Sequence, residues 1–141
     1  MRFSLCLIVC VSILFLFGCG PKRPDGMPKP YPVVVQIVSE GTPIEGATVL
    51  LMPQESGSRW AGSAITDSSG NAQIRVLGQY DGAPAGKYTV IVTKVVSEGE
   101  HDYGLIDPKY NDITKPAFQI EVKEQKNDFV EDVGKLVRIR Q

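Results

Sequence analysis

The chain has 141 residues, 43% of them hydrophobic and 22% charged, and this length corresponds to one ordinary domain. Fifteen Lys and Arg against sixteen Asp and Glu give a formal net charge of −1, which disfavours nucleic-acid binding through bulk charge. The single histidine leaves almost nothing for histidine-based catalysis or for a multi-histidine metal site.

The first nineteen residues have the pattern of an export signal. One positive charge in residues 1–4 precedes an uncharged apolar run over residues 5–18. As a helix this run rises about 21 Å, which is short of the roughly 30 Å hydrocarbon core of a bilayer. A charged start, a short apolar stretch and a small residue at its end are typical of a signal peptide.

The end of that run, Leu16-Phe17-Gly18-Cys19, resembles the lipobox of bacterial lipoproteins. The resemblance implies that residues 1–18 are removed as a lipoprotein signal peptide and that Cys19 carries a diacylglycerol and an N-acyl chain such as palmitate. The remaining cysteines, Cys6 and Cys10, would leave with the signal peptide, so the mature chain has no other thiol. The alternative is an ordinary secretory signal with a chance cysteine.

Residues 19–31 are predicted to be the acylated cysteine and a proline-rich tether. Half of the ten prolines lie within residues 20–32, and such a segment favours an extended spacer of about 40 Å. Gly20 follows the cysteine, where lipoproteins kept in the inner membrane often carry Asp. The resemblance therefore implies a lipid-anchored protein of the cell envelope, in the outer membrane if the host has two membranes.

The rest of the chain shows a period of two, which indicates strands. The clearest alternation is Phe118, Ile120 and Val122, and no segment of twelve residues shows a helical stripe. Seven short strands over about 100 residues predict a seven-stranded antiparallel two-sheet sandwich with Greek-key, Ig-like topology over residues 32–133. A basic C-terminal tail, residues 134–141, would follow. The expected strands are 33–38, 47–52, 60–66, 72–76, 88–93, 118–122 and 128–133.

Three motifs in this region carry a second resemblance. They are Thr-Pro-Ile-Glu-Gly-Ala-Thr-Val at 42–49, Thr-Asp-Ser-Ser-Gly-Asn-Ala at 66–72 and Pro-Ala-Gly-Lys-Tyr-Thr-Val at 84–90. In this order they resemble the carboxypeptidase regulatory-like domain of the transthyretin-like family. The resemblance implies the sandwich fold and says little about function, because the motifs encode turns and core positions.

No motif predicts catalysis, a cofactor or a metal. Residues 82–88 lack the spacing, the Ser or Thr and the following helix of a phosphate-binding loop. A β-turn accounts for the acidic and polar residues at 67–71, which lack the Gly and Glu of a calcium loop. His101 and Asp102 are adjacent in sequence, and adjacent side chains rarely have the mutual orientation that a catalytic dyad needs. We therefore expect a solvated loop histidine.

Binding is expected, if anywhere, at the 19-residue connection over residues 97–115. Its acidic residues are interleaved with Tyr103 and Tyr110, which suits an interface with charge steering and aromatic anchors. The candidate binding residues are therefore Tyr103, Asp107, Tyr110 and the lone Trp60. The competing interpretation is structural, with Tyr110 covering the edge of the core and Trp60 capping it.

These observations predict a non-enzymatic, membrane-anchored envelope lipoprotein whose β-sandwich is a binding or structural module for a protein or glycan. One alternative is a carbohydrate-binding accessory to nutrient uptake, with Trp60, Tyr103 and Tyr110 as a platform. The other is an accessory subunit of an envelope hydrolase that uses the acidic loop.

Overall fold

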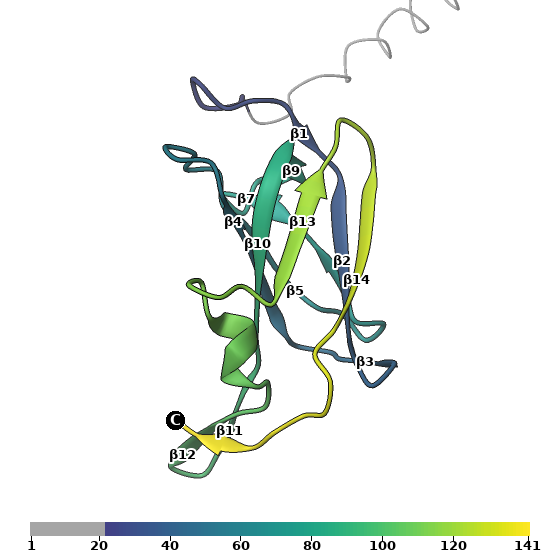
Figure 1. Ribbon diagram of the computed structural model, residues 1–141, viewed down its shortest axis with the longest axis vertical. Coiled ribbons are helices and arrows are strands. Elements are labelled where there is room, and N and C mark those ends of the chain that lie inside the picture. Colours follow the sequence, from purple (N-terminus) through teal and green to yellow (C-terminus); the bar gives the residue numbers. More distant parts are fainter. Residues whose placement is uncertain (1–21) are drawn as a thin grey trace, which may run out of the picture.

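The computed structural model describes residues 22–141, which form an all-β sandwich with one short 3-10 helix, η1 (Pro108–Asn111). Figure 1 shows an elongated molecule in which β1 lies near one end and the C-terminus lies at the other. The predicted all-β fold is confirmed. The predicted signal peptide and Cys19 lie outside the described residues.

The larger layer is a six-stranded sheet in which every pair is antiparallel. Its strand order is β13-β10-β4-β5-β7-β8, so β10 and β4 are interior strands and β13 is an edge strand. The strands are β4 (Thr48–Pro53), β5 (Gly62–Ile65), β7 (Arg75–Val76), β8 (Tyr80–Asp81), β10 (Gly86–Thr93) and β13 (Phe118–Val122).

The second layer contains one parallel pair, which the sequence did not predict. Its strands are β2 (Val33–Ser39), β3 (Thr42–Pro43), β6 (Asn71–Gln73) and β14 (Asn127–Asp132). β2 pairs antiparallel with β3 and β6 but parallel with β14, with Asn127 opposite Val33. The expected purely antiparallel sandwich of seven strands is therefore wrong in this pair and in its strand count.

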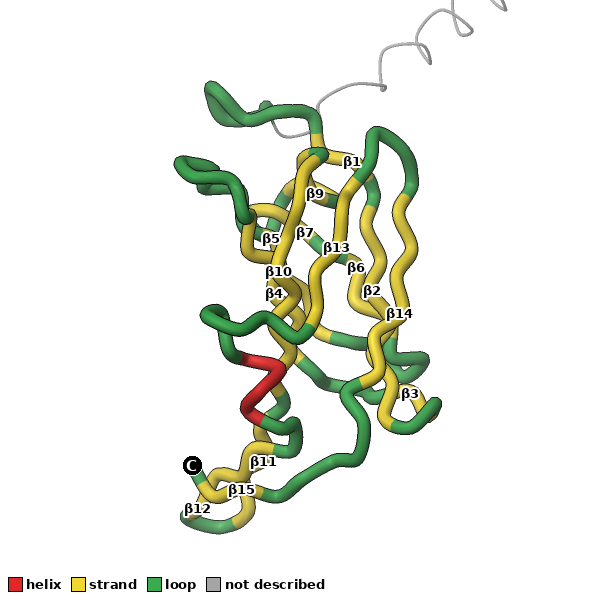
Figure 2. The backbone as a smooth tube through the Cα atoms, in the orientation of Figure 1, coloured by secondary structure: helices red, strands yellow, loops and turns green. Residues whose placement is uncertain are grey.

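The core lies between these two layers (Figure 2). In β2 the buried residues alternate with partly exposed ones, whereas β10 is buried along five consecutive residues because both of its faces are covered. Removing this apolar surface from water is the main stabilising contribution. The largest side chains with less than 2% exposure are those of Val35, Ile37, Val49, Leu51, Ile74, Val76, Val90, Val92 and Val122.

A third, smaller sheet lies at the C-terminal end of the molecule, in the order β11-β12-β15 (Figure 1). It consists of β11 (Val95–Glu98), β12 (His101–Gly104) and β15 (Ile139–Arg140). We call it the distal sheet. Residues 97–115 are therefore not the irregular connection that the sequence predicted, and part of the tail at 134–141 pairs with them.

The first described residues pack on the domain instead of leaving it as a spacer. β1 (Pro30–Tyr31) pairs antiparallel with β9 (Ala83–Pro84). Met27 is only 7% exposed and belongs to the hydrophobic core. The expectation of an extended spacer is thus wrong for residues 22–31, because one buried methionine and a short strand attach them to the sandwich.

Candidate functional site

The distal sheet brings the predicted binding residue Tyr103 close to charged side chains from β11 and from the residue just before β15. β11 and β12 join through a two-residue turn in which Gly99 adopts a φ of 62°, a backbone conformation that glycine adopts without steric cost. The guanidinium of Arg138 lies 4.0 Å from the centre of the Tyr103 ring. This cation–π arrangement joins the C-terminal segment to β12.

Glu98 completes this cluster. Arg138 Nη1 donates to Glu98 Oε1 at 2.9 Å, and Arg138 Nη2 donates to Glu98 Oε2. The bond from Arg138 lowers the pKa of the Glu98 carboxyl and raises that of the guanidinium. Both side chains are about half exposed, so the two-bond geometry orients the arginine more than it stabilises the fold. The result is an oriented aromatic and charged surface at the end of the molecule.

His101 lies on the same face of the distal sheet and is exposed. Arg140 Nη2 is 3.1 Å from its Nδ1, and the ring therefore contacts a cation. The Asp102 carboxylate instead accepts a hydrogen bond from Ser97 Oγ at 2.6 Å. Because successive strand residues point to opposite faces, His101 and Asp102 do not form a dyad. The histidine is exposed as expected, although it lies on a strand and not in a loop.

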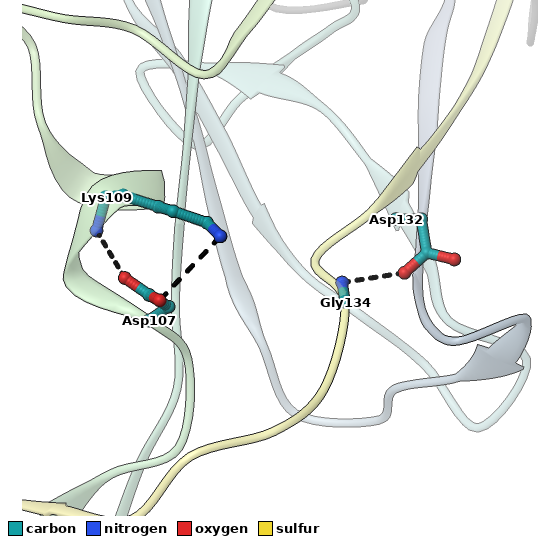
Figure 3. A network of polar contacts seen from close by, with 4 residues as sticks. All are labelled: Asp107, Lys109, Asp132 and Gly134. Carbon is teal, nitrogen blue, oxygen red and sulfur yellow. Dashed lines mark hydrogen bonds and ion pairs between the residues drawn. The ribbon is translucent and has the colours of Figure 1, made fainter.

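Asp107 caps the start of η1 through its contacts with Lys109, which Figure 3 shows, and Tyr110 packs η1 against the sandwich. The Asp107 carboxylate accepts a hydrogen bond from the Lys109 backbone N–H at 3.0 Å and lies 3.8 Å from its Nζ. The Tyr110 ring stacks on Phe118 with centroids 5.0 Å apart. Tyr110 therefore covers the edge of the core, as the structural interpretation expects, and η1 positions it there.

Trp60 lies in a different part of the molecule from Tyr103 and Tyr110. It is 8% exposed and belongs to the core. It lines a cavity of about 50 Å³ together with Pro28, Pro84 and Tyr88, next to the first described residues. The platform of Trp60, Tyr103 and Tyr110 is therefore wrong, because a buried ring beside Tyr88 cannot share a surface with the distal sheet.

The sequence motifs at 42–49 and 66–72 meet in one turn region. Thr66 Oγ1 accepts a hydrogen bond from the Ala47 backbone N–H at 2.8 Å. Asp67 Oδ1 accepts from the backbone N–H groups of Ser69 and Asn71 at 2.9 and 3.0 Å. These contacts make Asp67 a turn residue, as predicted, and they leave the motif with a structural role.

The third motif forms a tyrosine corner. Tyr88 Oη donates a hydrogen bond to the Pro84 carbonyl oxygen at 2.8 Å, four residues upstream in the manner known from other β-sandwiches. Burial, followed by the charge of Glu55, raises the pKa of Tyr88 to about 12. The hydroxyl therefore stays protonated and satisfied in the interior, and it is no candidate for acid–base chemistry near neutral pH.

Asp132 is a polar residue whose role the sequence reasoning missed. Its carboxylate accepts hydrogen bonds from the backbone N–H groups of Gly134, Glu40 and Gly41, at 2.7, 3.0 and 3.2 Å. These bonds lower its pKa. Figure 3 shows the bond from Gly134. The Asp-x-Gly spacing at 132–134 signals the local turn, and the residues at 40–43 signal a reversal of their own, but nothing in the sequence links Asp132 to that distant turn. Asp132 joins two loops and is not arranged to bind a ligand.

Within residues 22–141, no three His, Cys, Asp or Glu side chains lie together as metal ligands could. In the same part of the chain, no helix has the length and apolar character needed to cross a bilayer. Comparisons with family models, with curated proteins and with solved structures give no match for this chain.

Proposed function

We propose that the chain is a lipid-anchored protein of the bacterial cell envelope. Its carboxypeptidase regulatory-like β-sandwich would act without catalysis, as a binding or structural module for a protein or glycan. The anchor is supported by Cys19, which ends an apolar run too short to span a bilayer. Gly20 supports the outer membrane as the location in a host that has two membranes. The three motifs support the domain family, because their residues lie in turns and at buried positions of the kind that the resemblance implies.

The observation that carries the proposal is the placement of the distal sheet at the end of the molecule opposite β1 (Figures 1 and 2). A chain anchored at its N-terminus would present this sheet away from the anchor. The sheet exposes the apolar side chains of Val95 and Ile139, which are 54% and 40% accessible. On the opposite face of this sheet, the Tyr103–Arg138 pair offers residue types that are common at the energetic centres of interfaces.

The anchor is tested by metabolic labelling with a clickable palmitate analogue. The wild-type protein and the double variant Cys6→Ala/Cys10→Ala should carry the label, because these two cysteines precede the predicted cleavage site. Cys19→Ala should lose the label and the membrane attachment. Label that remains on Cys19→Ala would show that another group carries the lipid.

The binding role is tested by photo-crosslinking in intact cell envelopes. A photoreactive amino acid at Val95 reports on the distal sheet, and the same residue at Ile65, which is 68% exposed on β5, is the matched control. We expect a discrete crosslinked species from position 95 and none from position 65. Identical crosslinks from both positions would show that the distal sheet is not a specific interface.

A further inference from the structure

We infer that one end of this domain is built to face the lipid surface and that residues 22–31, here called the N-terminal strut, fix it there. The lipid-facing end consists of the strut, the loop at 54–61 and the turn at 123–126. Figure 1 shows these segments at the end from which the chain leads toward its N-terminus. The inference rests on the proposed anchor at Cys19.

The strut is attached to the sandwich at three successive points. Tyr80 Oη donates a hydrogen bond to the Lys22 carbonyl oxygen at 2.8 Å. Met27 then inserts into the core, with 7% exposure. Finally, β1 pairs with β9, with Tyr31 opposite Ala83. A segment held by a buried side chain and a strand pair moves with the domain, unlike a free linker.

Gly82 shows that this docking requires close approach. Its φ is 91°, and a Cβ placed on it would lie 1.9 Å from the Tyr31 carbonyl oxygen. No L side chain fits at that distance without moving the strut, so the glycine allows the backbone of β1 to lie against the chain before β9. The docked state is therefore specified by residues on both sides of the contact.

The number of residues limits how far the domain can lie from the anchor. Only three peptide units separate Cys19 from Lys22, and eight separate it from Met27. Fully extended, these spans reach at most about 11 and 29 Å. The strut therefore keeps the lipid-facing end within a few tens of ångströms of the headgroups, and it limits rotation of the domain.

The charge of the lipid-facing end suits an anionic headgroup surface. Its loops contain twice as many basic as acidic side chains, and all of them are exposed. Basic residues near an anionic surface gain electrostatic attraction over a Debye length of about 8–10 Å. The basic residues are Lys22, Arg23, Lys29, Arg59, Lys123 and Lys126, and the acidic ones are Asp25, Glu55 and Glu124.

Energy transfer to labelled headgroups tests this orientation on the full mature protein. With Cys19 acylated, a single introduced cysteine is the only reactive thiol. Ser56→Cys places a dye at the lipid-facing end and Glu100→Cys places one at the distal turn, both at exposed positions. β10 and β11 follow each other from Gly86 to Glu98 and rise up to about 40 Å along this path, so the two dyes are separated enough for transfer to distinguish them.

In vesicles of phosphatidylethanolamine and phosphatidylglycerol with acceptor-labelled headgroups, we expect several-fold higher transfer from position 56 than from position 100. Equal transfer, or more from position 100, would overturn the inference. Replacing phosphatidylglycerol with phosphatidylcholine should lower transfer from position 56, and unchanged transfer would overturn the contribution of the basic loops.

The role of the strut is tested by two changes. Gly82→Ala should undock β1 and reduce the difference between the two dyes. An insertion of about 20 Gly and Ser residues after Gly20 leaves residues 22–141 intact and should remove the difference. A difference that survives the insertion would overturn the strut's role. Palmitate labelling is read in parallel, so that an unlabelled protein refutes the anchor, whereas a labelled protein without the difference refutes only the orientation.

Discussion

Shortening Ile120 in edge strand β13 should destabilise the sandwich by an amount that its burial predicts. Ile120 is 5% exposed and faces the core. Ile120→Ala removes three carbons, about 2.4 kcal/mol of transfer free energy at about 0.8 kcal/mol per carbon. The cavity left behind adds to this, and such changes cost about 2–5 kcal/mol. Because an edge strand can relax into the space, we expect about 3 kcal/mol.

Leu51→Ala is the informative comparison, since it also removes three carbons. Leu51 is 0% exposed on β4, which is hydrogen-bonded on both sides, by β10 and β5. Less relaxation is possible there, so we expect about 4 kcal/mol. Glu121→Ala, at an exposed position next to Ile120, should stay within about 0.5 kcal/mol of wild type.

The assay is urea unfolding of the 22–141 fragment, followed by Trp60 fluorescence, with the slope m held as a check on two-state behaviour. A loss below about 1 kcal/mol for Ile120→Ala would refute its place in the core. A larger loss for Ile120→Ala than for Leu51→Ala would refute the relaxation argument.

Three further changes test separate contacts. Because burial raises the pKa of Tyr88 from 10.0 to about 12, the unfolded chain releases this proton first. The free energy of unfolding should therefore fall by about 2–3 kcal/mol between pH 10 and 12. In Tyr88→Phe the urea midpoint should change less over this pH range than it does in the wild type. Equal pH dependence of the two midpoints would contradict the assignment. Gly70→Ala should lower the melting temperature far more than Gly46→Ala. Both glycines have a positive φ, but only at Gly70 would a Cβ lie 2.6 Å from the Ile37 carbonyl oxygen. Equal losses of melting temperature would exclude the clash. Asp132→Ala should lower the free energy of unfolding at pH 7 and remove the loss of stability that the wild type shows below about pH 4. The reason is that the lowered pKa of Asp132 in the folded state contributes stability above the unfolded-state pKa, and this contribution is lost as the pH falls. An unchanged acid-unfolding profile would exclude this contribution.

Alternation of apolar side chains was enough to find every long strand. The strands at 118–122 and 88–93 were predicted because one or both of their faces are buried, which leaves a direct pattern in the sequence, and the structure extends the second strand back to Gly86. The expected strand at 72–76 is interrupted at Ile74, because β6 pairs with β2 while β7 pairs with β5. Which partner a strand takes depends on distant residues, and the parallel β14–β2 pair has the same cause.

The distal sheet could not be found by the same argument. β11 and β12 are exposed on much of both faces, so their side chains show no alternation. Asp107 and Tyr110 were singled out for their chemistry, and the structure gives them local contacts with Lys109 and Phe118. Those contacts depend on η1, which is too short to leave a helical period in the sequence.

The parallel pairing of β14 with β2 also determines when this chain can fold. Asn127 donates hydrogen bonds to the carbonyl oxygen of Pro32, 95 residues earlier in the chain. Closing a loop of that length costs conformational entropy before any strand contact compensates for it, and such distant pairings slow folding. The second layer can therefore close only after almost the whole polypeptide has been synthesised. Until then its first long strand lacks one neighbour, and the second layer of the nascent chain stays incomplete.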